Sequence, residues 1–263
     1  MKKLLAILLG LCLCLSCAFA EETTANKGTI GIISAMENEV KLLLAEAEID
    51  HVDKVGGVEY HIGTLCGKDV VIAQAGIGKI LSAAGTATML NRYPISALIF
   101  TGIAGGVGDE TQVLDMVIGT KLVQHDYGNQ NQDGFEWTST YNDADGYYSC
   151  DPDLVTLAYE AAKEVVGENH VFKGVIATGD QFVASGNYVK YLQDQFDALA
   201  CEMEGASVAA VCEKFGIPYV IIRCMSDKAD GKAHEAYDHF TDRAADNSGR
   251  IVVQMLEGLG GKQ

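Results

Sequence analysis

The sequence predicts an α/β fold in which helices cover both faces of a mainly parallel β-sheet. Short apolar runs of strand length alternate along the chain with segments whose apolar residues recur at helical spacing. Such alternation is typical of parallel sheets, because crossover helices connect their strands. Neither an internal repeat nor a linker interrupts the pattern. We therefore expect a single domain over residues 28–263.

The first half of the chain contains two kinds of element signal. Thr29–Ser34 and Ala97–Phe100 are apolar runs that predict buried strands, and Val40, Leu43 and Leu44 have the spacing of one helix face. We expect strands at 29–34, 57–64, 69–74, 97–100 and 115–123, with the second and third paired around Gly67, and helices at 37–47 and 80–90.

Residues 124–150 differ in composition from the rest. They are rich in Asn, Gln, Asp, Gly and Tyr and contain the only tryptophan, Trp137. A polar stretch of this length within a compact domain is usually functional or disordered. Beyond it we expect helices at 152–166, 186–195, 206–215 and 238–258, and strands at 171–177, 198–203 and 218–224.

Residues 1–20 have the pattern of a secretory signal peptide. Two lysines precede the apolar run Leu4–Leu15, and Ala18-Phe19-Ala20 is a small-x-small cleavage signal. The run is too short to span a membrane comfortably. We expect cleavage after Ala20, a polar leader over residues 21–27, and export to the periplasm or the medium. The alternative is a lipid anchor at Cys17, because Leu15-Ser16-Cys17-Ala18 is a loose lipobox.

Charge and cysteine usage exclude several classes of partner. The formal charge of −17 becomes −19 when the two lysines of the signal are removed, so nucleic-acid backbones and anionic membranes are unfavourable partners. Five cysteines follow the signal, scattered and mostly in apolar stretches, as expected of small buried hydrophobes. No Cys/His spacing indicates a metal site, and no disulfide framework is evident.

Two segments near the C-terminal end contain the most informative residues. Ala200–Ala206 places Glu202, Met203 and Glu204 at the start of an expected helix. Asp227 follows a buried apolar strand, and the carboxyl ends of strands are where α/β sheets bind ligands. Read without further context, Asp227 is equally a helix N-cap or loop aspartate.

Three further segments could contribute to the same site. Ser34–Val40 carries Glu39 directly after the first strand, Thr178–Val183 follows a later strand, and Gly102–Gly106 is expected to form a tight turn at a strand end. Gly76–Lys79 is a weak signal by itself, since the full P-loop pattern is absent. Taken alone, the phenylalanine at 182 would more often be a core residue.

These segments, in this order, resemble the 5'-methylthioadenosine/S-adenosylhomocysteine nucleosidases of the purine nucleoside phosphorylase/nucleosidase superfamily, over about residues 29–260. The resemblance implies a three-layer α/β/α sandwich with a central mixed, mainly parallel sheet. It also implies a homodimer that hydrolyses adenine nucleosides in nucleoside catabolism and methionine salvage, without a metal or cofactor.

The resemblance also assigns roles to individual residues. Asp227 would protonate adenine N7, Glu39 would act as the base for the attacking water, and Arg223 would help to hold that water. Glu204 would accept hydrogen bonds from the ribose hydroxyls. Glu202 receives no clear role. The remaining substrate contacts would come from Met36, Ala104, Gly105, Phe182, Val183, Met203, Ser226 and Tyr237, with Phe182 stacked on adenine and Tyr237 in the 5' pocket.

Arginine content favours water over phosphate as the nucleophile. Phosphorolysis needs a bound phosphate, which arginines usually clamp. The chain has only Arg92, Arg223, Arg243 and Arg250, and of these only Arg223 lies in a site motif.

The sequence departs from the family in two places. Ile103 occupies a position where some relatives have serine, which removes one possible water ligand. The segment Tyr127–Gly134 is polar where the family supplies apolar residues to the 5' pocket of the neighbouring subunit. Phe135, Trp137 or Tyr141 could restore an apolar pocket. The alternatives are therefore a nucleosidase or phosphorylase with altered 5' specificity, and a non-catalytic nucleoside-binding surface protein.

Overall fold

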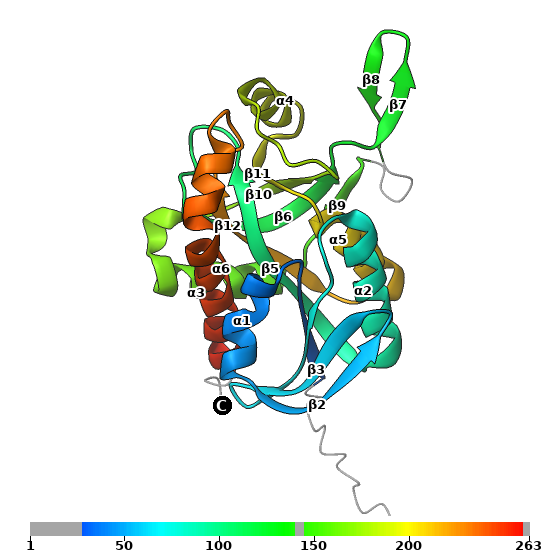
Figure 1. Cartoon of the computed structure of the whole chain (residues 1–263), viewed down its shortest axis with the longest axis vertical. Coiled ribbons are helices and arrows are strands. Elements are labelled where there is room, and N and C mark those ends of the chain that lie inside the picture. Colours follow the sequence, from blue (N-terminus) through cyan, green and yellow to red (C-terminus); the bar gives the residue numbers. More distant parts are fainter. Residues whose placement is uncertain (1–27, 140–144, 260–263) are drawn as a thin grey trace, which may run out of the picture.

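The computed structural model describes residues 28–139 and 145–259 (Figure 1). The expected signal peptide, the leader, Cys17 and Tyr141 lie outside the described residues. The strands are β1 (Thr29–Ser34), β2 (Glu48–Val55), β3 (Val58–Leu65), β4 (Lys68–Gln74), β5 (Ile95–Gly106), β6 (Met116–Gln124), β7 (Gly128–Asn131), β8 (Gly134–Trp137), β9 (Tyr147–Ser149), β10 (Val171–Thr178), β11 (Ala198–Glu202) and β12 (Tyr219–Asp227). The helices are α1 (Glu37–Glu46), α2 (Lys79–Arg92), α3 (Pro152–Val166), the 3-10 turn η1 (Glu168–His170), α4 (Gly186–Phe196), α5 (Gly205–Phe215) and α6 (Ala233–Gly258).

The main sheet is mixed, in the order β11-β10-β6-β12-β5-β1-β4-β3-β2. Strands β4, β1, β5 and β12 run parallel to one another, as do β6, β10 and β11, and the two groups meet where β12 and β6 pair antiparallel. Strand β11 also pairs with the end of β5, so that five strands close on themselves. This closure brings strand ends that are distant in sequence to one rim.

Helices pack on both faces of the sheet, as the sequence predicted. Helices α1, α3 and α6 lie together on one side, and α2 packs with α5 on the other (Figure 1). Between them the central strand β12 is buried along its whole length, and Ile32 of β1 and Leu98 of β5 are fully buried. Because both faces are covered, these strands consist almost entirely of apolar residues rather than alternating ones.

Several element boundaries differ from the sequence prediction. Strand β2 was missed because it is an edge strand that pairs only with β3 and is mostly exposed, which removes its apolar signal. Helix α6 begins at Ala233 rather than at 238. Strand β5 continues to Gly106, so Gly102–Gly106 is extended strand and not the expected tight turn.

The polar stretch 124–150 is ordered over most of its described length. Strands β7 and β8 form an exposed hairpin that projects from the body at the upper right (Figure 1), and β9 pairs with β6. Trp137 anchors the base of the hairpin. Its indole N–H donates to the Gln124 carbonyl at 2.9 Å and its ring packs edge-on against Phe196. The hairpin is thus a defined element whose exposed strands carry no apolar alternation.

Four of the five described cysteines (Cys150, Cys201, Cys212 and Cys224) are buried and unpaired, as expected, whereas Cys66 is exposed. No helix in the described ranges is both long and apolar enough to cross a membrane.

Candidate active site

The carboxyl ends of β1, β5, β10, β11 and β12 surround a cavity of about 130 Å³. Eleven of the twelve site residues expected from the sequence line it: Met36, Glu39, Ala104, Gly105, Phe182, Val183, Met203, Glu204, Ser226, Asp227 and Tyr237. Arg223 is the exception, because its side chain is fully buried behind the wall of the cavity. Segments separated by up to about two hundred positions therefore converge on one site.

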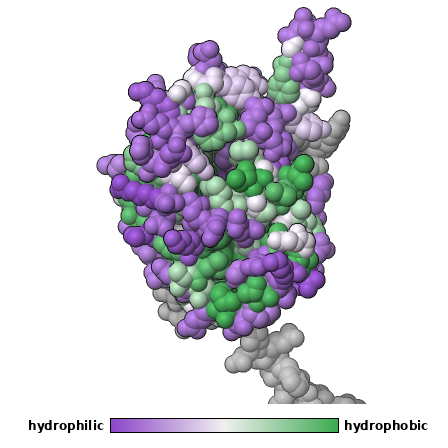
Figure 2. Space-filling model, in the orientation of Figure 1, coloured by the Kyte–Doolittle hydropathy of each residue, from purple (hydrophilic) through white to green (hydrophobic). Residues whose placement is uncertain are grey.

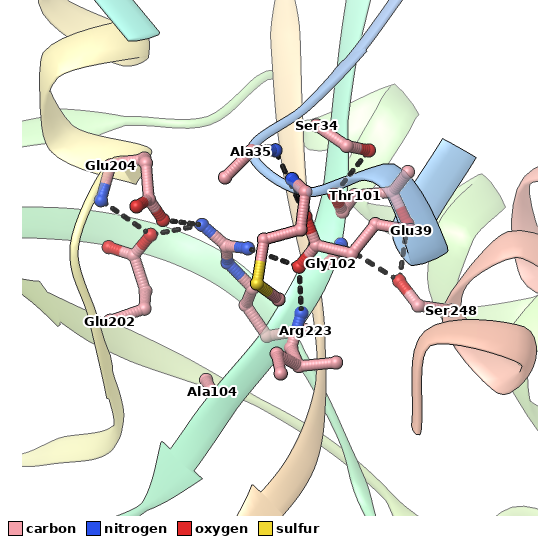
Figure 3. A network of polar contacts seen from close by, with 12 residues as sticks. Ser34, Ala35, Glu39, Thr101, Gly102, Ala104, Glu202, Glu204, Arg223 and Ser248 are labelled. Atoms are coloured by element: carbon pink, nitrogen blue, oxygen red, sulfur yellow. Dashed lines mark hydrogen bonds and ion pairs between the residues drawn. The ribbon is translucent and has the colours of Figure 1, made fainter. Parts of the chain in front are cut away.

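The Arg223 guanidinium is surrounded by three buried carboxylates (Figure 3). Its Nη2 atom donates to Glu202 and, at 3.2 Å, to Glu204, and its Nη1 atom lies 3.9 Å from Glu39 Oε1. The guanidinium also lies over the ring of Phe100, with its carbon 4.5 Å from the ring centre. One buried cation thus faces three acids, and its loss would leave these carboxylates without a charge partner.

Glu202 holds the turn between β11 and α5. Its Oε2 accepts the backbone N–H groups of Glu204 at 3.0 Å and Gly205 at 2.7 Å, and its Oε1 accepts the Thr178 hydroxyl. The role of Glu202 was not clear from the sequence. Its contacts with the N-terminal turn of α5 and with Arg223 explain why a second glutamate stands beside Glu204.

Glu39 lies in the first turn of α1 and accepts three backbone donors. Its Oε2 receives the N–H groups of Ala35 at 3.0 Å and Met36 at 2.8 Å, and its Oε1 receives that of Ile103 at 2.9 Å. Burial raises the pKa of the Glu39 carboxyl, while Arg223 and the backbone donors oppose this rise. The contact from Ile103 is made by its backbone, so the side chain at that position does not affect it.

Gly102 permits this close packing. A Cβ atom there would collide with both Arg223 Nη1 and Glu39 Oε1. Gly105 likewise allows Asp227 to approach the strand, because the Asp227 Oδ1 would lie 3.0 Å from an added Cβ. The glycines of this segment are therefore required because side chains approach the strand closely, and not because the chain turns.

Glu204 is the N-cap residue of α5 and faces both the cavity and Arg223. Its Oε1 accepts the Gly78 N–H at 2.8 Å. Burial raises the pKa of the Glu204 carboxyl to about 7, against the opposing attraction of Arg223. The carboxyl therefore changes charge near neutral pH.

Asp227 ends β12 on the opposite side of the cavity. Its Oδ2 accepts the Ser226 hydroxyl at 2.8 Å and its Oδ1 accepts the Ala229 N–H at 2.7 Å. Burial raises the pKa of the Asp227 carboxyl, and these hydrogen bonds partly counteract the rise. A carboxyl held in this way can carry a proton that it donates to a bound molecule.

The rim on the Asp227 side is aromatic. Phe182 stacks on His234 with ring centres 4.6 Å apart and meets Tyr237 edge-on at 5.6 Å. Phe182 remains 42% exposed, so one face of its ring is open to a planar ligand.

Several lining residues were not singled out from the sequence. They are Ala35, Ile77, Gln181 and Cys201; Ile103, noted in the sequence as a departure from the family, also lines the cavity. The Gly76–Lys79 motif was noticed but judged weak, and it provides both Ile77 and the Gly78 donor to Glu204. Phe135 and Trp137 do not line the cavity formed by this chain. Within the described ranges, no group of three or more His, Cys, Asp or Glu side chains could hold a metal ion.

Comparison with known proteins agrees with this geometry. Residues 29–257 match the family model of the phosphorylase superfamily. The 5'-methylthioadenosine/S-adenosylhomocysteine nucleosidase of Bacillus cytotoxicus is 38% identical over 235 residues, which cover 88% of this chain and 99% of the relative. That of Shewanella sediminis is 36% identical over 231 residues, with the same coverage of both chains.

Solved structures give the same result. The Neisseria meningitidis 5'-methylthioadenosine/S-adenosylhomocysteine nucleosidase, in complex with methylthio-immucillin-A, superposes with a TM-score of 0.81 at 35% identity, over 88% of this chain and 99% of the other. The futalosine hydrolase of Helicobacter pylori superposes with a TM-score of 0.79 at 33% identity, over 89% of this chain and the whole of the other.

Proposed function

Because this chain belongs to the phosphorylase superfamily and, within it, to the 5'-methylthioadenosine/S-adenosylhomocysteine nucleosidases, we propose that it hydrolyses the N-glycosidic bond of these two nucleosides and releases adenine. The observation that supports this most strongly is the presence of Glu39, Glu204 and Asp227 around one cavity, with Phe182 at its rim. An acid, a base and a sugar-binding carboxylate are what hydrolytic cleavage of a purine nucleoside requires.

Asp227 is the proposed general acid. Adenine leaves poorly as an anion, so a proton must reach N7 as the glycosidic bond breaks. Burial raises the pKa of the Asp227 carboxyl and so favours the protonated form that a general acid requires. The Ser226 hydroxyl fixes its orientation from one side.

Glu39 is the proposed base for the attacking water. Burial raises the pKa of the Glu39 carboxyl, which makes its carboxylate a stronger base. Arg223 Nη1 and Nε are buried and have no hydrogen-bond partner among the described residues, although Nη1 lies 3.9 Å from Glu39 Oε1. Buried donors of this kind attract an oxygen ligand, and a water between Arg223 and Glu39 would satisfy Nη1 and lie beside the base.

Glu204 is the proposed ribose clamp. A carboxylate offers about four acceptor positions, and the protein uses one on each oxygen, from Gly78 and from Arg223. One position on each oxygen remains for the 2'- and 3'-hydroxyls. The same carboxylate would stabilise positive charge that develops on the sugar. Met36 and Met203 line the cavity as apolar contacts for the sugar.

Water is favoured over phosphate as the nucleophile. Arg223 does not line the cavity, and its guanidinium is shared among three glutamates, so it is poorly placed to clamp a phosphate. The four carboxyls that line the cavity, those of Glu39, Glu202, Glu204 and Asp227, would also repel a dianion. These features support hydrolysis rather than phosphorolysis.

A second candidate is a related nucleoside with a different 5' group. The polar sequence of residues 127–134 and the likeness to a futalosine hydrolase both favour it. Tyr237, which lines the cavity, favours the thioether substrates instead.

A homodimer is the proposed assembly. Ile77, Ile80 and Leu81 are 53%, 79% and 52% exposed at the start of α2, and Ile77 also lines the cavity. Figure 2 shows hydrophobic residues gathered in the right half of this face, the side on which α2 lies in Figure 1. A second copy covering this patch would also close the cavity. Sedimentation of the purified chain tests the dimer.

Export is proposed from the signal-like residues 1–20, with an anchor at Cys17 as the alternative. Cell fractionation combined with N-terminal sequencing of the mature protein tests both.

The activity is tested by release of the free purine base, adenine or hypoxanthine, by purified residues 21–263. Methylthioadenosine, S-adenosylhomocysteine, adenosine, inosine and futalosine are supplied separately, each with and without phosphate. Phosphate-independent release from the two thioethers is the expected result. Release only from futalosine or only with phosphate would redirect the assignment, and binding without release would favour a nucleoside-binding protein.

A further inference from the structure

The Gly76–Lys79 segment contacts Glu204 although it lies 126 positions before it. Gly76 and Gly78 have φ values of +103° and +94°, a backbone region that favours glycine. Glycine at both positions imposes few backbone restraints of its own, because glycine has the greatest conformational freedom. Ser82 holds the segment locally, since its hydroxyl donates to the Gly76 carbonyl at 3.1 Å, and the position of the Gly78 N–H relative to Glu204 also depends on how the segment is attached to other elements.

Lys79 provides that attachment. Its ammonium donates to Asp126 Oδ1 at 2.6 Å and to Gln124 Oε1 at 3.2 Å, both at the end of β6. The side chains of Lys79 and Asp126 are only 18% and 13% exposed. An ion pair this enclosed is less screened by salt than a surface pair.

Asp180 completes a closed ring of contacts with Lys79 and Asp126, here called the Lys79 ring. The Lys79 N–H donates to Asp180 Oδ1 at 2.8 Å, and the Asp180 N–H donates to Asp126 Oδ2 at 2.9 Å. Asp180 stands two residues before Phe182, at the rim of the cavity. The ring therefore joins the start of α2, the end of β6 and the segment after β10.

We infer that Lys79 is a positioning residue for the ribose clamp: through the Lys79 ring it fixes Gly78, and Gly78 fixes the carboxylate of Glu204. This inference rests on the proposed role of Glu204. Lys79 does not line the cavity, and its contacts all go to protein groups. For the ribose hydroxyls, we expect its effect to pass through the orientation of Glu204.

A comparison of ribose with 2'-deoxyribose substrates separates positioning from general destabilisation. Lys79→Met removes the charge and retains most of the length of the side chain. We expect kcat/KM for methylthioadenosine to fall about tenfold. For 2'-deoxy-methylthioadenosine, which offers Glu204 one hydroxyl fewer, we expect a fall of no more than about twofold. An equal loss on both substrates, or no loss, would overturn the inference.

Three further variants make this test decisive. Lys190→Met removes a lysine from an exposed pair with Asp194 on α4 and serves as the matched control, with no change expected on either substrate. Asp126→Asn weakens the ring from its other side and should reproduce the substrate-selective loss. In a Glu204→Gln background, Lys79→Met should add little, since its target is already altered, whereas additive losses would contradict the inference.

Failure of the proposed function can be distinguished from failure of the inference about Lys79. If the wild-type chain releases no adenine, the same pair of ligands is compared by calorimetry, where Lys79→Met should reduce the preference for the ribose form. An unchanged preference would overturn the inference independently of catalysis. Thermal unfolding of each variant shows whether it is folded.

Discussion

The two sides of the cavity are built differently. On the sugar side, Glu39, Glu202 and Glu204 surround Arg223, and backbone N–H groups from four segments hold the carboxylates. On the base side there is one carboxylate, Asp227, with partly exposed aromatic rings beside it. The sugar side is fixed before any ligand binds, whereas the base side keeps an open stacking face. Under the proposed function, positioning is concentrated where charge would develop, and the planar base would be held by stacking contacts that tolerate adjustment.

The largest expected effect comes from the single acid of the base side. Asp227→Asn preserves shape and one hydrogen-bond acceptor but removes the proton donor, so kcat should fall by about 10² to 10⁴. Steady-state adenine release measures this, with circular dichroism as the check of folding. Turnover near the wild-type level would show that the base side does not supply the acid.

The cluster of Arg223 and three glutamates on the sugar side should contribute strongly to the free energy of unfolding. Arg223→Met leaves three buried carboxylates without their cation, and we expect the free energy of unfolding to fall by about 3–5 kcal/mol. Urea denaturation gives the value. Arg92→Met is the matched control, because Arg92 is half exposed and lies 3.8 Å from Asp53, and its loss should cost less than about 1 kcal/mol. Similar costs for the two variants would contradict the contrast between the buried cluster and the surface.

The aromatic rim should influence binding more than chemistry. Phe182→Ala removes the stacking face, and we expect KM to rise about tenfold with a smaller change in kcat. Phe215→Ala, which removes a similarly exposed ring at the end of α5, should leave both constants unchanged. A fall in kcat at unchanged KM would instead assign Phe182 to the chemical step.

The pH dependence sharpens the comparison further. Glu204 must be ionised to accept two hydroxyl hydrogen bonds, and its pKa is raised to about 7 by burial. We therefore expect kcat/KM to rise with pH up to about 7, by about tenfold per unit on the acid side. Glu204→Gln should abolish this limb of the profile. A limb that persists in the variant would assign it to another group.

The Glu204 carboxyl should make stability fall with rising pH, whereas it makes kcat/KM rise. Because its pKa is higher in the folded chain than in the unfolded chain, the folded state binds more protons between the two values. Its contribution to stability is complete below the unfolded value of about 4.5 and is lost as pH rises through about 7. Urea midpoints across this range, for the wild type and Glu204→Gln, measure the difference.

By itself, the sequence determined which segments form the core and in what order. Buried strands and helices leave a local periodic signal, so β1, α3 and β10 were predicted closely. The motifs around Glu39, Glu204 and Asp227 were also evident, because each follows a recognisable strand. Local patterning failed for β2 and for the β7–β8 hairpin, whose exposed polar residues carry no such signal.

Only the tertiary structure decided how these segments meet. The pairing of β11 with β5 closes the strand ends into one rim, and no property of either strand alone predicts it. The same holds for Gly78 beside Glu204 and for Lys79 between Asp126 and Asp180, contacts that join residues 47 to 126 positions apart. Such contacts depend on how packed elements are oriented in space. The periodicity of a sequence records which side of an element is buried, and it does not record which distant side chain will lie against it.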